Sequence, residues 1–367
     1  MIADCSLCGR SDWEAVYRVD RLPLFQNKTF GTQEDGINAP TAPLELVQCL
    51  SCGFVWNRLF DPVLMNYNQS YHNEQHYSQV FQAYLEQLVL MLKEAGFQEK
   101  RIIEIGCGKG YFLDGLQKHG FARLKGYDPA YEGNNPQILK TYFNQHTQFD
   151  AADLIIMRHL LEHIADPMRF LRNIAIANQR KGMMFIEVPD FDWIIQRQAF
   201  WDIYYEHCNY FTKASLQQLC QYAKIRNIFH DQYMYLWGEV NEFSERVNPS
   251  HSVQIMPQHL FYSKQAGYRR RLISDQKHVV VWGGASKGVT FLNVLDHERE
   301  YVQYVIDINP HKQGRFIAGT GHAIVSPEAL RELAGERVLI VITNENYAQE
   351  IRQQIASFPI TPEFVVL

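Results

Sequence analysis

The stretch RIIEIGCGKGYFLDGL, residues 101–116, decides the fold. Its aliphatic residues 102–105 predict a short buried strand, and Gly106, Gly108 and Gly110 follow at once, before a helical pattern begins. A strand, a glycine turn and a helix form the nucleotide-binding unit of doubly wound α/β folds, because small residues let the backbone approach a ligand. The third glycine follows the first by four positions, not by the five of the dinucleotide fingerprint.

Two carboxylates accompany this turn. Glu104 lies two positions before the first glycine, and the next strand of the pattern, ARLKGYDPA, ends with Asp128. A carboxylate at that place can accept hydrogen bonds from ribose hydroxyl groups. The glycine turn and this carboxylate together suit an adenosine that carries no pyrophosphate.

A second glycine turn lies in the C-terminal third of the chain. The sequence HVVVWGGASKGVTFLNVL, residues 278–295, again predicts a strand, a turn and a helix, and a further strand ends at Asp307. Gly283, Ala285 and Gly288 fit a relaxed dinucleotide spacing. Taken alone, this unit is equally compatible with a nicotinamide enzyme and with a degenerate nucleotide-binding scaffold.

Four of the seven cysteines form two pairs near the N-terminus. Each pair has two intervening residues and is followed by glycine; the pairs are Cys5 with Cys8 and Cys49 with Cys52. Two such turns can present four thiolates tetrahedrally to Zn²⁺, and four thiolates leave no open coordination position. A redox CxxC pair is the competing interpretation, but two copies without a thioredoxin-like context favour a structural zinc site.

Length and composition bound the class of protein. A chain of 367 residues with 46% hydrophobic residues predicts two or three soluble globular domains. The net charge of −5 argues against a nucleic-acid surface. No stretch approaches the roughly 18 apolar residues of a membrane span, and the N-terminus MIADCSLCGR lacks the regions of a secretory signal, so we expect a cytoplasmic protein without a membrane anchor.

The segment DIYYEHCNYFT, residues 202–212, concentrates proton-handling side chains between apolar neighbours. Imidazole titrates near neutral pH, and a carboxylate or a phenol beside it can move that pKa. Such a triplet also occurs in ordinary mixed segments of surface and core, so its meaning depends on its surroundings.

The glycine pattern E-x-G-x-G-x-G, with an acidic residue ending the second strand, resembles class I S-adenosylmethionine (SAM)-dependent methyltransferases. The sequence DLIIMRHLLEHIADP, residues 153–167, resembles the fourth strand of that family and its following turn, and KGMMFIEVPD resembles its fifth strand. By this resemblance, Glu104 and the three glycines border the methionine part of the cofactor, and Asp128 binds its ribose. The acidic residue often found near the adenine is not evident in the third-strand segment KTYFNQHTQFD, residues 140–150, so the adenine contact stays unassigned.

The order of parts narrows the resemblance. A four-cysteine module, a central methyltransferase and a C-terminal Rossmann-like domain with a G-x-x-x-K-G turn and DINPHKQG resemble the sugar C-methyltransferases, which act on nucleotide-linked keto-deoxysugars. In that family the C-terminal domain uses no nicotinamide and closes over the substrate. The fold class that this implies is α/β, with a central doubly wound methyltransferase domain, a small zinc-binding module and a C-terminal Rossmann-like domain.

The resemblance places the Tyr-x-Glu-His segment in the active site. Methylating a carbon requires a base that removes a proton next to a ketone while the enolate oxygen is stabilised. We assign His207 as the base, Glu206 as the residue that orients it and Tyr204 as a donor to a sugar oxygen. If the segment is helical, Tyr204 and His207 share one face. His163 is a second active-site imidazole, with a capping or core histidine as the equal alternative.

The sequence leaves alternatives open. An O- or N-methyltransferase on the same scaffold could dispense with His207, and a binding protein could have lost activity, although the intact motifs argue against decay. We expect domains at residues 1–65, 66–245 and 246–367, with a bridging helix after residue 251. The partner is a small-molecule substrate, and the sequence defines neither the sugar, nor the nucleotide, nor the oligomeric state.

Overall fold

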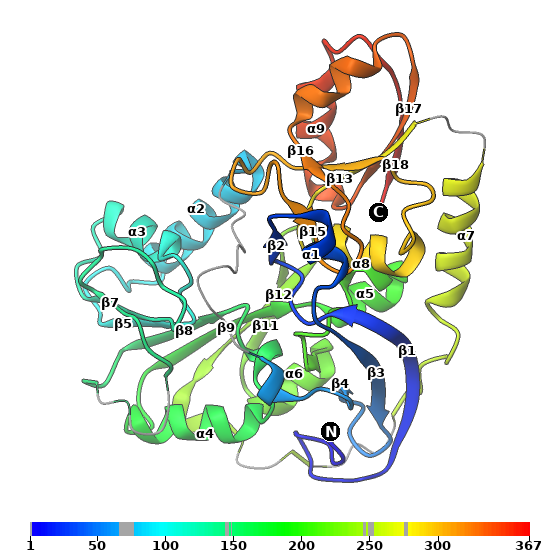
Figure 1. Ribbon diagram of the computed structural model, residues 1–367. Coiled ribbons are helices and arrows are strands. Elements are labelled where there is room, and N and C mark those ends of the chain that lie inside the picture. The colour runs from blue at the N-terminus through cyan, green and yellow to red at the C-terminus, as the bar shows by residue number, and fades with distance from the viewer. Residues whose placement is uncertain are drawn as a thin grey trace.

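The fold is described in a computed structural model, for residues 2–65, 77–143, 147, 149–244, 247–248, 253–274 and 278–367. Figure 1 shows a methyltransferase-like α/β unit at the left, a C-terminal α/β unit at the top and an N-terminal β unit at the lower right. Within the described residues, no helix is both long and apolar enough to cross a membrane.

The central sheet has seven strands. Its order is β11 (Lys224–Ile228), β12 (Tyr233–Glu239), β9 (Met183–Pro189), β8 (Leu154–Arg158), β5 (Ile102–Ile105), β6 (Leu124–Tyr127) and β7 (Ile138–Leu139). The strands from β9 to β7 pair in parallel, whereas β12 runs antiparallel to β9, and β11 runs antiparallel to β12. The chain order reverses direction between β5 and β8, which is where doubly wound sheets bind ligands.

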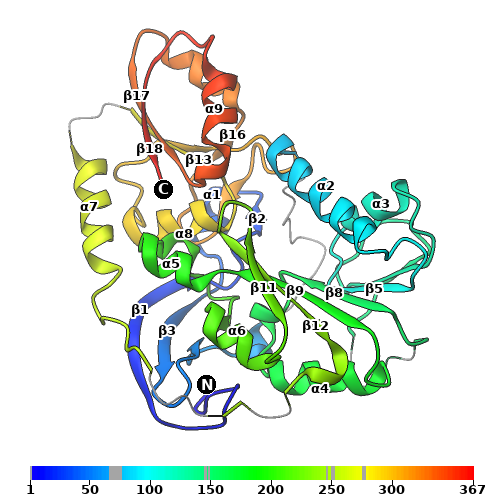
Figure 2. The same cartoon turned by 180° about the vertical axis from the view of Figure 1, so that it is seen from behind.

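Helices cover both faces of this sheet (Figures 1 and 2), because its strands are apolar on both sides. On one face, α2 (Gln79–Glu94) and α3 (Tyr111–Lys118) pack over Ile102 and Ile156. On the other, α4 (Pro167–Ala177) and α6 (Lys213–Leu219) pack over Ile103 and Met157. The remaining short helices of this unit are α5 (Phe191–Arg197), η2 (Leu161–His163), η3 (Phe200–Asp202) and η4 (Val240–Glu242).

One strand lies elsewhere than predicted. The third strand of the methyltransferase half is the two-residue β7 at Ile138–Leu139, ahead of the segment 140–150 in which the sequence places it. That segment carries the polar run NQHTQ and offers no continuous apolar side to the sheet. Its residues 144–146 and 148 lie outside the described part of the chain.

The C-terminal unit holds a five-stranded parallel sheet. Its order is β16 (Ile324–Val325), β14 (Tyr304–Ile306), β13 (His278–Trp282), β17 (Arg337–Ile342) and β18 (Thr361–Val366). Its helical segments are α8 (Ser286–Leu295), η5 (Pro327–Leu333), η6 (Glu345–Tyr347) and α9 (Ala348–Ile355). The predicted bridging helix is α7 (Tyr262–Ile273), which lies along one side of the molecule (Figure 1). The predicted α/β fold class is therefore confirmed.

The N-terminal unit is completed by later parts of the chain. Strands β1 (Trp13–Pro23), β3 (Thr41–Cys49) and β4 (Val55–Asn57) form a sheet whose fourth strand is β10 (Asn209–Tyr210). The short β2 (Thr29–Phe30), which precedes α1 (Gln33–Ile37), pairs with β15 (Phe316–Ile317). The single turn η1 (Pro62–Leu64) follows β4. The domain limits near residues 65 and 245 stay a prediction.

Candidate active site

The first glycine turn opens into a cavity of about 430 Å³ at the carboxyl ends of β5 and β6. Gly106, Gly108 and Gly110 have φ angles of +76°, +55° and +86°, a region that side chains with a Cβ rarely adopt. A Cβ at Gly110 would lie 2.5 Å from Ile138 Cδ1. The turn therefore needs its glycines, both for its backbone and for close packing beneath it.

The two predicted carboxylates line this cavity. Asp128 accepts hydrogen bonds from the main-chain N–H groups of Gly108 and Ala130, each at 2.8 Å. Glu104 is 2% exposed, its Oε2 has no hydrogen-bond partner, and burial raises its pKa to about 8. A buried carboxylate oxygen that lacks a partner fits a ligand with hydrogen-bond donors or positive charge. The residues present therefore fit SAM.

The four N-terminal cysteines converge as predicted. Their sulfur atoms all lie within 4.8 Å of one another, and none forms a disulfide. Cys5 Sγ lies 3.6 Å from Cys52 Sγ, and Cys8 Sγ lies 3.5 Å from Cys49 Sγ. After each pair, Gly9 or Gly53 turns the chain with a positive φ. This donor set suits a structural Zn²⁺ ion.

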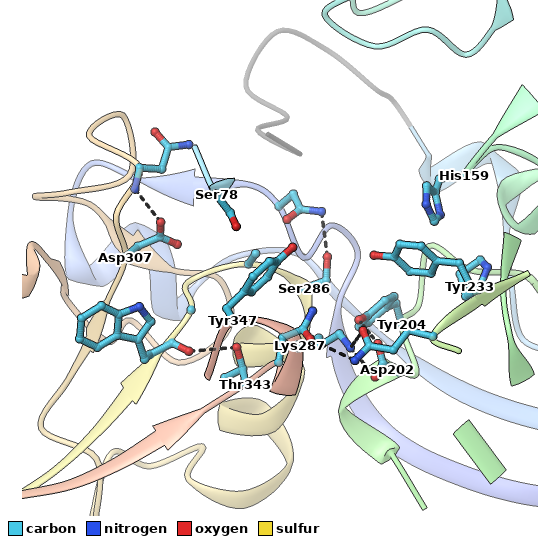
Figure 3. A pocket seen from close by; sticks show the side chains of 18 of the residues that line it. Ser78, His159, Asp202, Tyr204, Tyr233, Ser286, Lys287, Asp307, Thr343 and Tyr347 are labelled. Atoms are coloured by element: carbon cyan, nitrogen blue, oxygen red, sulfur yellow. Dashed lines mark hydrogen bonds and ion pairs between the residues drawn. The ribbon is translucent and has the colours of Figure 1, made fainter. Parts of the chain in front are cut away.

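A second cavity, of about 210 Å³, lies between the methyltransferase and C-terminal units. Tyr204, Glu206 and His207 line it from one side. Figure 3 shows Asp307, Thr343 and Tyr347 on the other side, with Ser286 and Lys287 between. His159 and His163 line both this cleft and the cavity of the first glycine turn. The two spaces therefore adjoin at these imidazoles, where a group could pass from one ligand to the other.

The Tyr-x-Glu-His segment is a turn between η3 and β10, so the helical condition in our prediction is not met. Tyr204 and His207 nevertheless come together, with ring centroids 4.7 Å apart. Burial, then His163 and His159, hold the pKa of His207 well below its usual value. His207 is therefore neutral at neutral pH, the form that can accept a proton.

His163 and Glu206 form the wall behind His207. The His163 ring lies at right angles to the His207 ring, with centroids 4.7 Å apart. His163 Nδ1 lies 3.0 Å from the main-chain oxygen of Glu206 and 4.0 Å from its Oε2. Glu206 Oε1 accepts a hydrogen bond of 3.1 Å from the main-chain N–H of Gln26, in the N-terminal unit. Glu206 is thus held from two sides and contacts His163.

A buried charge network lies behind the shared wall, and sequence reasoning missed it. Arg158 Nε lies 2.9 Å from Glu187 Oε2, and His159 Nε2 lies 2.8 Å from Glu187 Oε1. Burial alone would lower the pKa of His159, but Glu187 and Glu162 raise it to about 9. Burial alone would raise the pKa of Glu187, but Arg158 and His159 lower it to about 2. His159 also has a φ of +49°, a strained backbone typical of functional sites.

Sequence reasoning also missed two sets of contacts at the site. Tyr204 donates a 2.9 Å hydrogen bond to Asp202 Oδ1, and Lys287 Nζ lies 3.0 Å from Asp202 Oδ2. Glu162, His163 and His207 also place possible metal-ligand atoms within 4.8 Å of one another. The signals were in stretches already quoted: the sequence RHLLEH contains His159 and Glu162, and the second glycine turn contains Lys287.

Family models match the two α/β units separately. Residues 75–227 match the model of a methyltransferase domain. Residues 264–366 match the model of a C-methyltransferase C-terminal domain. The order of these two matches agrees with the order of parts in the sequence.

The chain is similar to several known proteins. C-methyltransferase NovU of Streptomyces niveus is 23% identical over 95% of this chain and 91% of its own length. A ubiquinone biosynthesis O-methyltransferase of Aeromonas salmonicida is 29% identical over 26% of this chain and 45% of its own length. A solved SAM-dependent methyltransferase of Mesorhizobium loti covers 42% of this chain and 96% of its own, at 12% identity and a TM-score of 0.31.

Proposed function

We propose that this chain, a SAM-dependent methyltransferase with a C-methyltransferase C-terminal domain, methylates a carbon beside the ketone of a nucleotide-linked keto-deoxysugar. The observation that carries the proposal is the position of His207, which lines a cleft that adjoins the cofactor cavity and packs against Tyr204 and His163. Methyl transfer to oxygen or nitrogen needs positioning more than carbon-acid chemistry, whereas transfer to carbon needs a base that removes a proton from a C–H bond. The likeness to NovU along nearly the whole chain supports the same reaction class.

Three tasks are assigned to residues of this chain: cofactor binding, proton removal and positioning of the base. Glu104, Asp128 and the first glycine turn hold SAM, which supplies an electrophilic methyl group when bound. His207 removes the proton from the carbon next to the ketone, and the electron pair of that C–H bond moves into the enolate. His163 packs against the His207 ring, and the main-chain oxygen of Glu206 in turn holds His163.

The C-terminal side of the cleft supports a substrate that carries an anionic group. Lys312 lines it, together with the polar side chain of Asn309 and the ring of Tyr347. A nucleotide diphosphate attracts ammonium groups, and an aromatic ring can stack on its base. We also propose that Cys5, Cys8, Cys49 and Cys52 bind a structural Zn²⁺ ion.

The test is a panel of nucleotide-linked 4-keto sugars incubated with the protein and SAM, followed by mass spectrometry. We expect a gain of one methyl group on carbon, and exchange of the proton beside the ketone when the substrate is held in heavy water. His207→Asn should abolish both and keep SAM binding, because loss of a general base costs a factor of about 10² to 10⁴. Tyr204→Phe should be milder.

His230→Asn is the matched control, since His230 is an exposed histidine in the β11–β12 turn. It should change neither exchange nor turnover. A product methylated on oxygen or nitrogen, or near-normal turnover by His207→Asn, would reject the proposal in favour of the O- or N-methyltransferase.

A further inference from the structure

Lys287 belongs to the C-terminal unit but reaches into the catalytic half. It is in the first turn of α8, directly after the second glycine turn. Its ammonium group lies 3.0 Å from Asp202 Oδ2, with the two side chains 14% and 12% exposed (Figure 3). It also donates a 3.1 Å hydrogen bond to Gln232 Oε1 and lies 5.2 Å from the Trp193 ring. A lysine at a helix start after a glycine turn commonly binds phosphate, but this one is held by a carboxylate and an amide.

Asp202 connects Lys287 to the catalytic segment. Its Oδ1 accepts the Tyr204 hydroxyl at 2.9 Å, and the Tyr204 ring lies against His207. A phenol has one proton to donate, so Tyr204 can give it to a sugar oxygen only by leaving Asp202. The position of Tyr204 therefore depends on Asp202, and the charge of Asp202 is balanced by Lys287.

The sign of that charge matters for the chemistry. An unbalanced carboxylate beside the cleft would repel the negative charge that forms on the enolate, and a poorly hydrated site strengthens such repulsion. It would also stabilise the protonated form of His207, so that a smaller fraction of the imidazole is in the neutral, proton-accepting form at a given pH. An ammonium group 3.0 Å from the carboxylate cancels both effects.

We propose that Lys287 is a positioning residue through which the C-terminal unit completes the active site: it neutralises Asp202 and so keeps Tyr204 and the field around His207 fit for enolate formation. This proposal rests on the proposed function for its kinetic readout. Its second readout needs no substrate.

The kinetic experiment compares Lys287→Met, Asp202→Asn, the double variant and Lys287→Arg in the full-length protein. Lys287→Met should lower kcat and the exchange rate at least about tenfold, with KM and affinity for S-adenosylhomocysteine (SAH) within about threefold. Adding Asp202→Asn should restore most of the exchange, since the unbalanced charge is gone, and Lys287→Arg should retain more activity than Lys287→Met. Lys213→Met is the control, because Lys213 is an exposed lysine in the first turn of α6.

The second experiment follows the His207 ring by NMR during a pH titration, with His207→Asn to assign the signal. Lys287→Met should raise the His207 pKa, and the double variant should return it. The other groups near His207 stay constant in this comparison; they are His159, Glu162, His163, Glu206, Tyr204 and Tyr210.

A rise in KM with unchanged kcat would overturn the proposal and make Lys287 a ligand of the substrate anion. A double variant no better than Lys287→Met would also overturn it. If the parent protein instead methylates oxygen or nitrogen, the proposed function fails, and the His207 titration alone decides the role of Lys287.

Discussion

The two glycine turns share a sequence pattern and differ in their surroundings. In both, the carboxylate that ends the next strand accepts a main-chain N–H of the turn: Asp128 from Gly108 at 2.8 Å and Asp307 from Gly284 at 2.9 Å. At the first turn, a Cβ on Gly108 would meet nothing within 4 Å, whereas a Cβ on Gly288 would lie 1.9 Å from the Gly283 oxygen. The centre of the first turn has open space, whereas at the second turn the start of α8 packs tightly on the turn's own backbone.

The buried charges beside the turns differ as well. Asp128 and Glu104 border the first, and the positive charge of bound SAM would favour the ionised form of Glu104, whose pKa burial raises to about 8. At the second, the buried Lys312 donates a 3.2 Å hydrogen bond to the Gly284 oxygen, and Lys287 lies in the following helix. A glycine pattern therefore predicts the shape of a turn, while the charges around it indicate which ligand the turn can accept.

Removing zinc should have the largest effect. It should disturb the cleft beside the second turn more than the cavity at the first turn. Free energies of zinc binding are about 10–16 kcal/mol in small modules, so chelation should unfold the N-terminal unit. That unit supplies Gln26 to Glu206, and Asn27 Nδ2 donates to Ser286 Oγ at 2.8 Å, both in the cleft. We expect turnover to fall by about 10²-fold or more, with a smaller loss of affinity for SAH, as measured by metal analysis, kinetics and calorimetry.

The parent protein should contain about one zinc per chain. A metal-free protein with normal turnover would contradict the zinc assignment. Two metals per chain would place one at Glu162, His163 and His207 and would remove His207 as a base.

Replacing Asp128 by alanine should have the next largest effect, and the same change at Asp307 is its matched control. Asp128→Ala removes the acceptor of the Gly108 and Ala130 main-chain N–H groups and the expected ribose ligand, so SAH affinity should fall about 10- to 100-fold. Asp307→Ala, the matched change at the second turn, should leave SAH affinity unchanged. Calorimetry measures both. Equal losses, or tight binding of NAD by the parent protein, would mean that we have assigned the turns wrongly.

Replacing a glycine by alanine tests how tightly the start of α8 packs on the second turn. Gly288→Ala puts a Cβ against backbone, which cannot move away cheaply, and should destabilise the protein by about 1–3 kcal/mol. Gly267→Ala is the control, because that helical glycine in α7 has open space and should be neutral or stabilising by about 0.5–1 kcal/mol. Thermal unfolding gives both values. A Gly288→Ala protein as stable as the parent would show that the start of α8 can move away from the second turn.

The last effect is expected from pH, through the charge network near the first turn. The folded pKa of His159, about 9, lies above its ordinary value of 6.5, so its stabilisation is complete below pH 6.5 and is lost as pH rises through 9. Between these values the parent should lose more stability than His159→Gln, on the order of 3 kcal/mol for the full shift. Denaturant unfolding at several pH values measures this difference. The exposed His230→Gln should behave like the parent, and an identical loss in His159→Gln would exclude His159 as the cause.

Local features of the sequence predicted much of the fold. The strand at 102–105, the glycine turns and the cysteine pairs each depend on neighbours within a few positions, where periodicity and spacing are informative. The third strand escaped prediction because β7 has only two residues and so shows no periodic pattern.

The site was predicted less completely. The sequence singled out Tyr204, His163 and His207, and the structure brings them together, while their catalytic roles stay a prediction. The contacts of Asp202 with Lys287 and of Gln26 with Glu206 join distant segments, and a single sequence contains no sign of such pairs. His159 lay in a quoted stretch, but only the fold sets it against Glu187 on the neighbouring strand.

The strands that complete the N-terminal unit have a consequence for biosynthesis. Its sheet gains β10 only after residue 210 has been made, and β2 finds its partner only after residue 317. Domains usually fold in the order in which the ribosome releases them, but here the first segment to emerge must wait for the last third of the chain. During that wait, a metal ion on the four cysteines can hold the early strands together without their late partners. Zinc supply during translation should therefore affect the yield of folded protein more than zinc added afterwards.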